Sequence, residues 1–313
     1  MTGRTAKYSL LWLGVLVPLV MAVTLVLISG LRVLGLRIPE AGAPFQTEVM
    51  RQRAEQSGYS NPFNVPWTPL EDMSAALVCA VVKAEDRSFF RHRGFDWSQL
   101  AKAARLALAS NVAMGGSTIT QQLARNLYLS QQRSWWRKIE EAVLTVWLEI
   151  WLGKDQILAL YLNSIEWGRN VWGANAAAHG YFHIPPRELG LEQALFLASL
   201  IANPRTNVRS QLDRMSAVYS RVNHQLLFSG YYSVDRWQRA NATWGSFASA
   251  LQRGKPIYLA LSAFNGTVGI EKLSAASAFR DGCGFDKETE NMLQAQGGNP
   301  VSIADRDSVD PAR

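Results

Sequence analysis

The 313-residue sequence has little cysteine and little charge, and its glycines and prolines follow no period. The two cysteines, Cys79 and Cys283, have no second cysteine or histidine at metal-ligand spacing, which argues against zinc sites and disulfide scaffolds. The missing glycine and proline period excludes collagen-like and repeat architectures. The chain is 48% hydrophobic and has 11 tryptophans, so it can fill a core and is not wholly disordered.

The charge is unevenly distributed along the chain. Residues 87–140 hold nine Lys or Arg and two Asp or Glu, a net of +7, which equals the net charge of the whole protein. Residues 281–313 hold three basic and seven acidic residues, a net of −4. A concentrated basic region attracts anionic partners such as nucleic acid, lipid headgroups or a phosphorylated substrate. A solvated basic surface without a ligand is the alternative.

The N-terminus contains a long apolar run. No charged residue occurs in the 24 residues from Tyr8 to Leu31, and 10–28 are almost entirely apolar. Because about 20 apolar residues span a bilayer, we expect a transmembrane signal anchor rather than a cleaved signal peptide. Basic residues flank the run on both sides, so charge counting leaves its orientation open. A short cytoplasmic tail is the favoured arrangement.

Four regions follow from these patterns: a stub and anchor over 1–31, a connector over 32–70, a main domain over 71–230, and an extension over 231–313. Proline, glycine and polar residues in the connector favour extended or turn structure. Apolar residues at three- and four-residue spacing predict a mostly α-helical main domain, with helices around 71–86, 97–111, 134–153, 154–165 and 189–204. The extension is predicted to be helical near 233–251 and to end in an acidic tail.

Two clusters in the main domain have the composition of functional sites. In EDRSFFRHRG (85–94), adjacent carboxylates follow an apolar helix, where the helix dipole disfavours negative charge. In GGSTITQQLARN (115–126), Ser117 or Thr118 can cap a helix whose N–H groups face an anion, and Gln122 shares a helix face with Arg125. Read singly, these motifs also fit a salt-bridged glutamate, a structural histidine and an ordinary capped helix.

Two further clusters follow. In RKIEE (137–141), Arg137, Lys138 and Glu141 can face one site, although surface ion pairs have the same pattern. Trp135 and Trp136 just before it suit either a core or a membrane interface. KDQILALYLN (154–163) is an amphipathic helix in which packing explains the leucines.

These four clusters, in this order, resemble the motifs of the peptidoglycan glycosyltransferases of family 51. The family patterns are E-D-x-x-F-x-x-H-x-G, G-G-S-T-I-x-Q-Q-L-x-K-N, R-K-x-x-E and K-x-x-I-L-x-x-Y-L-N, and the resemblance covers about 75–205. The S-x-x-K and K-T-G signatures of an attached transpeptidase domain are missing from the sequence, so the chain resembles the monofunctional members.

The resemblance implies a lysozyme-like helical domain on the periplasmic side of the bacterial inner membrane. Such enzymes polymerise lipid II into β-1,4-linked glycan strands, release undecaprenyl diphosphate and invert the donor linkage. Membrane lipids and other cell-wall synthesis and division proteins are the expected partners. Nucleic acid is not expected, because outward topology would separate the basic region from the genome.

The resemblance also assigns residue roles. Glu85 aligns with the general base and Glu141 with a second essential glutamate, which either orients Lys138 or holds the diphosphate through a divalent ion such as Mg²⁺ or Mn²⁺. Arg125 stands where the family usually has lysine, which keeps the charge but changes its geometry. Lys154 is expected to add charge at the rim. The expected substrate-binding residues are Asp86, Phe89, His92, Ser117, Thr118, Gln121, Gln122, Arg125, Asn126, Arg137, Lys138 and Lys154.

Two rival functions remain at this point. A lysozyme-like glycan hydrolase would share the helical fold and a catalytic glutamate, but it would not need cations for a diphosphate. A non-catalytic, membrane-tethered cell-wall scaffold would have no chemical reason to keep Glu85, Lys138 and Glu141 together. Incubation with labelled lipid II separates the hypotheses, since a transferase gives polymer and a hydrolase shortens glycan.

Overall fold

The computed structural model describes residues 36–43, 45–58, 65–110, 116–132, 134–265 and 283, and these residues form a mostly helical protein, as predicted. The apolar run over 10–28, predicted to be a membrane anchor, lies outside the described residues. Among the helices of the described part, none combines the length and the apolar character needed to cross a bilayer.

The five helices predicted in the main domain are all present. Each begins and ends close to the boundary expected from its pattern: α3 (Ala75–Glu85), α4 (Trp97–Ser110), α6 (Trp135–Trp151), α7 (Lys154–Ser164) and α9 (Leu191–Leu200). The other helices are α2 (Glu48–Gln56), α5 (Ile119–Tyr128), α8 (Gly173–Phe182), α10 (Leu212–Phe228), α11 (Val234–Gln252) and α12 (Ile257–Ala260). A two-stranded antiparallel sheet, β1 (Glu166–Gly168) and β2 (Val171–Trp172), follows α7.

The centre of the molecule is the packing of α3 against α9. Every residue of α9 is buried, and so is almost every residue of α3 from Ala75 to Lys83, because both sequences are mostly apolar and their few polar residues are buried with the rest. Helix α10 packs against both. The last turn of α3 thus leaves the core at Glu85, and this fixes the position of the first candidate site residue.

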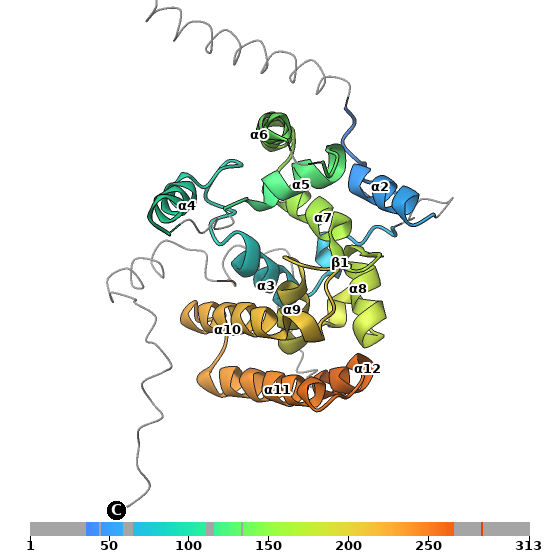
Figure 1. Cartoon of the computed structure of the whole chain (residues 1–313), viewed down its shortest axis with the longest axis vertical. Helices are drawn as coiled ribbons and strands as arrows, with labels where there is room; N and C mark the ends of the chain where they lie inside the picture. Colours follow the sequence, from blue (N-terminus) through green and yellow to red (C-terminus); the bar gives the residue numbers. More distant parts are fainter. Residues whose placement is uncertain are drawn as a thin grey trace, which may run out of the picture.

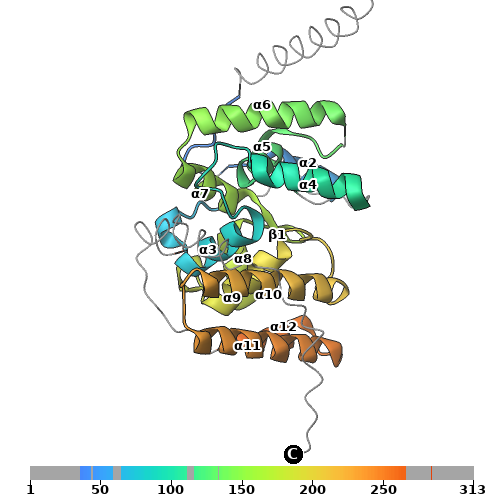
Figure 2. The same ribbon diagram turned by 90° about the vertical axis from the view of Figure 1, so that its left-hand side faces the viewer.

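The helices are stacked along the long axis of the molecule. Helices α4 and α6 lie toward one end, α3, α9 and α10 lie in the middle, and α11 with α12 closes the opposite end (Figures 1 and 2). Helices α5 and α7 lie between the first two of these layers (Figures 1 and 2), and α5 packs on both α6 and α7. The four sequence motifs therefore belong to the upper and middle layers of the stack.

The expectation of extended or turn structure in the connector is wrong over residues 48–56, which form α2. Thr47 caps this helix by accepting the Met50 N–H. Val49 and Met50 are buried with Val65 and Trp172, and α2 packs against α5. The helix therefore belongs to the folded domain and places its side chains beside those of α5.

The predicted helix near 233–251 is α11, and it is not a detached extension. Phe247 and Phe264 pack edge-on or tilted against Phe196 of α9, with ring centroids 5.4 and 5.5 Å apart. Arg236 donates to the fully buried Glu192 at 2.9 Å, which offsets the cost of burying that carboxylate. Residues 234–264 thus share the core of the preceding helices.

The two cysteines form a disulfide, which corrects the sequence-based argument against one. Cys79 lies on α3 and is fully buried, and Cys283 follows it by 204 residues with a Cα–Cα distance of 5.6 Å. Sequence spacing could not show this pair, because the fold alone brings the two residues together. The bond ties a residue far along the chain to the central helix.

We expect the disulfide to contribute stability. In the chain-entropy account a bond closing so long a loop stabilises by at most ~5 kcal/mol. Replacing Cys283 by Ser, which leaves α3 unchanged, should lower the melting temperature of the full chain to that of the reduced wild-type protein. A wild-type melting temperature that reductant leaves unchanged, with two free thiols titrated, would contradict the pairing.

Candidate active site

Glu85 ends α3, where its carboxylate meets side chains from α5 and α10. Burial raises the pKa of Glu85 above the ordinary value of 4.5, while a hydrogen bond from Gln122 and the charges of Arg221, Arg214 and Arg125 oppose the rise. A glutamate with a raised pKa near cations is suited to accept a proton at neutral pH.

Gln122 and Tyr161 form a hydrogen-bonded chain that ends on Glu85. Gln122 Nε2 donates to Glu85 Oε2 at 2.9 Å, and the Tyr161 hydroxyl donates to Gln122 Oε1 at 2.8 Å. Tyr161 is fully buried on α7, so it fixes which way the Gln122 amide faces. The chain therefore aims an N–H donor at the carboxylate of Glu85.

Asp86 and His92 hold the loop after α3 rather than opening toward a ligand. His92 Nε2 lies 3.0 Å from both Asp86 oxygens, and Asp86 Oδ2 accepts the Ile119 N–H at 3.1 Å. The Asp86 side chain is 1% exposed. This carboxylate joins the end of α3, the following loop and the start of α5.

Phe89 and Lys154 lie inside the same loop packing. The Phe89 ring is fully buried, with Lys154 Nζ 4.4 Å from its centroid. Lys154 Nζ donates to Glu149 Oε1 at 2.7 Å, and its side chain is 16% exposed. The structure therefore places Lys154 in an internal ion pair, which corrects the expectation of a cation at the rim.

The first motif ends in a glycine, Gly94, because a side chain at this position would clash with α6. Gly94 has φ +83°, and a Cβ there would lie 2.6 Å from Thr145 Cγ2 of α6. Its carbonyl accepts a hydrogen bond from Thr118 Oγ1 at 2.7 Å. Gly94 thus allows the loop to approach both α6 and the start of α5.

The second motif begins α5 as predicted, with Thr118 and not Ser117 as the cap. The Thr118 hydroxyl accepts the Gln121 N–H at 3.2 Å, and Gln121 Oε1 accepts the Thr118 N–H at 2.9 Å. This reciprocal pair is a capping box. Gln121 is buried, so its contacts are structural, whereas Gln122 on the next position reaches Glu85.

A cavity of about 450 Å³ adjoins Gln122 and collects several predicted residues. Four arginines line it against one carboxylate, Glu166. Its lining is Val49, Arg53, Gln122, Arg125, Asn126, Ser130, Gln131, Arg137, Ile165, Glu166, Ile201, Ala202, Asn203, Pro204 and Arg205. The excess of guanidinium groups makes it suited to an anionic ligand.

Glu141 and Lys138 lie together on α6, as their spacing predicts. Lys138 donates to the Glu141 carboxylate, and the side chains are 58% and 1% exposed. Within the described part of the chain, no three His, Cys, Asp or Glu side chains are grouped as metal ligands. The structure therefore shows Glu141 in an ion pair with Lys138.

Several residues near Glu85 and the cavity had no signal in the motif analysis. Tyr161 stood within the fourth motif without an assigned role, and Arg214 and Arg221 come from α10 beyond the motifs. Arg221 Nη2 donates to the Ala84 carbonyl at 3.3 Å, beside Glu85. Only the packing of α10 on α3 shows these positions.

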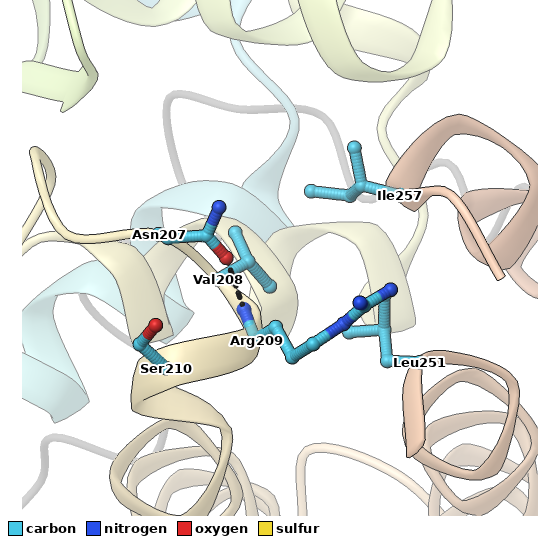
Figure 3. Close-up of a pocket in the computed structure, with 6 residues that line it drawn as sticks. All are labelled: Asn207, Val208, Arg209, Ser210, Leu251 and Ile257. Atoms are coloured by element: carbon cyan, nitrogen blue, oxygen red, sulfur yellow. Dashed lines mark hydrogen bonds between the residues drawn. The ribbon is translucent and has the colours of Figure 1, made fainter. Parts of the chain in front are cut away.

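A second cavity of about 410 Å³ lies between residues 207–210 and the ends of α11 and α12 (Figure 3). Arg209 is its charged lining residue, and its guanidinium donates to the Lys255 carbonyl at 2.9 Å. Asn207 accepts the Arg209 N–H at 2.9 Å. Because it holds neither a carboxylate nor a motif residue, the cavity beside Gln122 is the better candidate site.

Comparison with known proteins identifies the family of the chain. A sequence model of the transglycosylase family matches residues 52–226, more than half of the chain. The chain belongs to the transglycosylase family. Glu85 and the lining residues of the arginine-rich cavity, except Val49, lie within the matched range.

Individual relatives carry the same description. A biosynthetic peptidoglycan transglycosylase of Azoarcus sp. (strain BH72) is 40% identical over 190 residues, covering 59% of this chain and 82% of the relative. One from Nitrosomonas eutropha is 43% identical over 166 residues, covering 52% and 68%. This transglycosylase is therefore a glycosyltransferase enzyme of peptidoglycan biosynthesis.

The contacts of Glu85 predict a pH dependence for the transglycosylase. Burial raises the pKa of Glu85, so if this residue acts as the base that the resemblance implies, kcat/KM should fall on the acid side at a pH above 4.5. Replacing Gln122 by Met removes a donor that stabilises the charged carboxylate, so the acid limb should move to higher pH. The measurement is kcat/KM against pH for both proteins.

An exposed glutamine, Gln252 at the end of α11, provides the matched control. Gln252→Met should keep the wild-type profile. An unchanged acid limb in Gln122→Met would show that the hydrogen bond from Gln122 does not affect the pKa that governs this limb.

Proposed function

We propose that the protein polymerises lipid II into β-1,4-linked glycan strands and releases undecaprenyl diphosphate. The observation that carries the proposal is the Glu85 carboxylate, with its raised pKa, hydrogen-bonded to a residue that lines an arginine-rich cavity. A base and a cationic site side by side are what transfer from a diphosphate-linked sugar requires.

Glu85 is the general base of the proposed reaction. The 4-hydroxyl of the acceptor sugar loses its proton to Glu85 as its oxygen bonds to the anomeric carbon of the donor. The bond from that carbon to the diphosphate breaks, and the diphosphate leaves with the electron pair. One displacement of this kind turns an α-linked donor into a β-linked product, so the reaction inverts without a covalent intermediate.

Arg125 and Arg137 stabilise the leaving diphosphate. Both line the cavity, and Arg137 Nη1 also donates to the Ser130 carbonyl at 3.3 Å, which orients its guanidinium. Charge grows on the diphosphate oxygens as the bond breaks, so fixed cations stabilise the transition state more than the bound substrate. Asn126 lines the same cavity and offers a neutral donor.

The remaining predicted residues act through the framework of the site. Asp86, His92 and Thr118 fix the loop and the start of α5, and so place Glu85 and Gln122. Glu141 holds Lys138 by an ion pair at the surface of α6. We assign Glu141 the role of orienting Lys138 toward the diphosphate, and Ser117 a place beside the helix cap.

Exposed apolar side chains support a membrane-facing surface for the lipid-linked substrate. On α4 these include Trp97, 71% exposed, and on α6 they include Ile150 and Trp151, 69% and 67% exposed. Both helices lie toward the same end of the molecule (Figure 2). Tryptophans and aliphatic side chains grouped at one end suit the interface of a bilayer.

The disulfide supports a location outside the cytoplasm. Disulfides persist in oxidising compartments such as the periplasm and are rare in the cytosol. Together with the apolar run over 10–28, the Cys79–Cys283 bond favours a single-pass inner-membrane protein with its catalytic domain in the periplasm.

The Glu85→Gln variant tests the proposed chemistry. It keeps the shape of the side chain but cannot accept the proton, so polymerisation of labelled lipid II should fall at least ~10²-fold. Glu188→Gln, at a 46% exposed position between α8 and α9, is the control and should keep wild-type activity. Near-wild-type polymer yield in a folded Glu85→Gln protein would remove Glu85 as the base, and shortened glycan from the wild type would favour a hydrolase.

The exposed apolar side chains generate a separate prediction. Replacing Trp97 and Trp151 by Ser should slow polymerisation of lipid II embedded in vesicles while leaving the rate in detergent unchanged. Tyr258→Ser on α12, at the opposite end and 70% exposed, is the control. Equal rates in vesicles for the wild type, the tryptophan variant and Tyr258→Ser would exclude a role of this surface at the membrane.

A further inference from the structure

Two arginines of the cavity lie outside the four motifs and have unused donors. Arg53 comes from α2 and Arg205 from the segment after α9. Among the described residues, Arg53 Nε and Arg205 Nη1 are buried and have no hydrogen-bond partner. A buried donor without an acceptor is unfavourable unless a ligand supplies one.

A single carboxylate, Glu166, interacts electrostatically with both guanidinium groups. Arg205 Nη1 lies 3.6 Å from Glu166 Oε1, within ion-pair distance but without a hydrogen bond. That same oxygen accepts the Asn170 N–H at 3.0 Å, so the turn between β1 and β2 already uses it. Burial and the neighbouring charge of Arg205 lower the pKa of Arg53, while the charge of Glu166 opposes this change.

We infer that Arg53 and Arg205 form an oxyanion subsite for the peptidoglycan precursor, next to the arginines that face the leaving group. Arg53 Nη1 donates to Gln56 Oε1 at 3.1 Å, so Arg53 Nε and Arg205 Nη1 are the two buried donors that remain for the oxygens of a carboxylate or phosphate. The inference rests on the proposed function, since the precursor is the substrate of that reaction. Its peptide carboxylates and its diphosphate are the two sources of an oxyanion.

Glu166 sets the affinity of the subsite. With its negative charge the pair has a local excess of one positive charge, and without it the excess is two. Removal of an arginine and removal of Glu166 should therefore change substrate binding in opposite directions. If these side chains had only a structural role, both kinds of substitution would impair substrate binding.

Steady-state kinetics of the full chain in detergent tests the inference. Arg53→Gln and Arg205→Gln should raise KM for lipid II about tenfold with little change in kcat, and Glu166→Gln should lower KM. Arg205→Lys keeps the charge but loses the fork geometry, so its KM should lie between those of the wild type and Arg205→Gln. Arg187→Gln, 67% exposed on the segment after α8, is the matched control.

Two substrates identify the oxyanion. If the subsite takes a peptide carboxylate, the KM difference should disappear with lipid II whose peptide carboxyls are amidated, and if it takes the diphosphate, the difference should persist. Unchanged KM in both arginine variants on both substrates would overturn the inference while leaving the proposed function intact. A wild-type protein that forms no polymer would instead overturn the proposed function.

Discussion

The hydrogen bonds accepted by the Asp86 carboxylate hold together the segments on which the site depends. Asp86 follows the last residue of α3, contacts His92 in the next loop and accepts the first N–H of α5. The Asp86 carboxylate is buried and joins the end of α3 to the start of α5. Glu85 Oε2 and Gln122 Nε2, which belong to these two helices, lie 2.9 Å apart. The geometry of the base is thus a consequence of a neighbouring structural carboxylate.

The electrostatics of the site combine two opposing effects. Burial at the end of α3 disfavours the charged form of Glu85, and the arginines of α5 and α10 favour it. The net effect is a pKa above the ordinary value of glutamate, which suits the proposed role of Glu85 as a proton acceptor. The same arginine excess continues into the cavity, where a single glutamate faces four guanidinium groups. Base and anion site are two parts of one charge distribution.

Much of the fold could be predicted because its helices carry strong apolar patterns and its motifs are short and continuous. Helices α3, α6 and α9 are clear from spacing alone, and the pairing of Lys138 with Glu141 follows from helix geometry. Helix α2 was missed because EVMRQRAEQ has only three buried residues and becomes a helix through its packing on α5. Local pattern carries no information about such tertiary support.

The parts of the site that escaped prediction are brought together only by the fold. Arg53 and Arg205 are 152 residues apart in the numbering and meet in one cavity lining, and Cys79 meets Cys283 across 204 residues. Tyr161 reaches Gln122 from another helix. Motif analysis proposed Glu85 as the base, and the three-dimensional arrangement identified the side chains that contact this carboxylate and line the adjoining cavity.

Direct titration of the Glu85 carboxyl is the measurement closest to the central claim. Carbon-detected NMR of carboxyl-labelled glutamate, assigned by comparison with the Glu85→Gln spectrum, follows this group without a substrate. The account predicts a midpoint above the ordinary 4.5 of glutamate. A midpoint at or below that value would contradict the view that burial prepares Glu85 to act as the base.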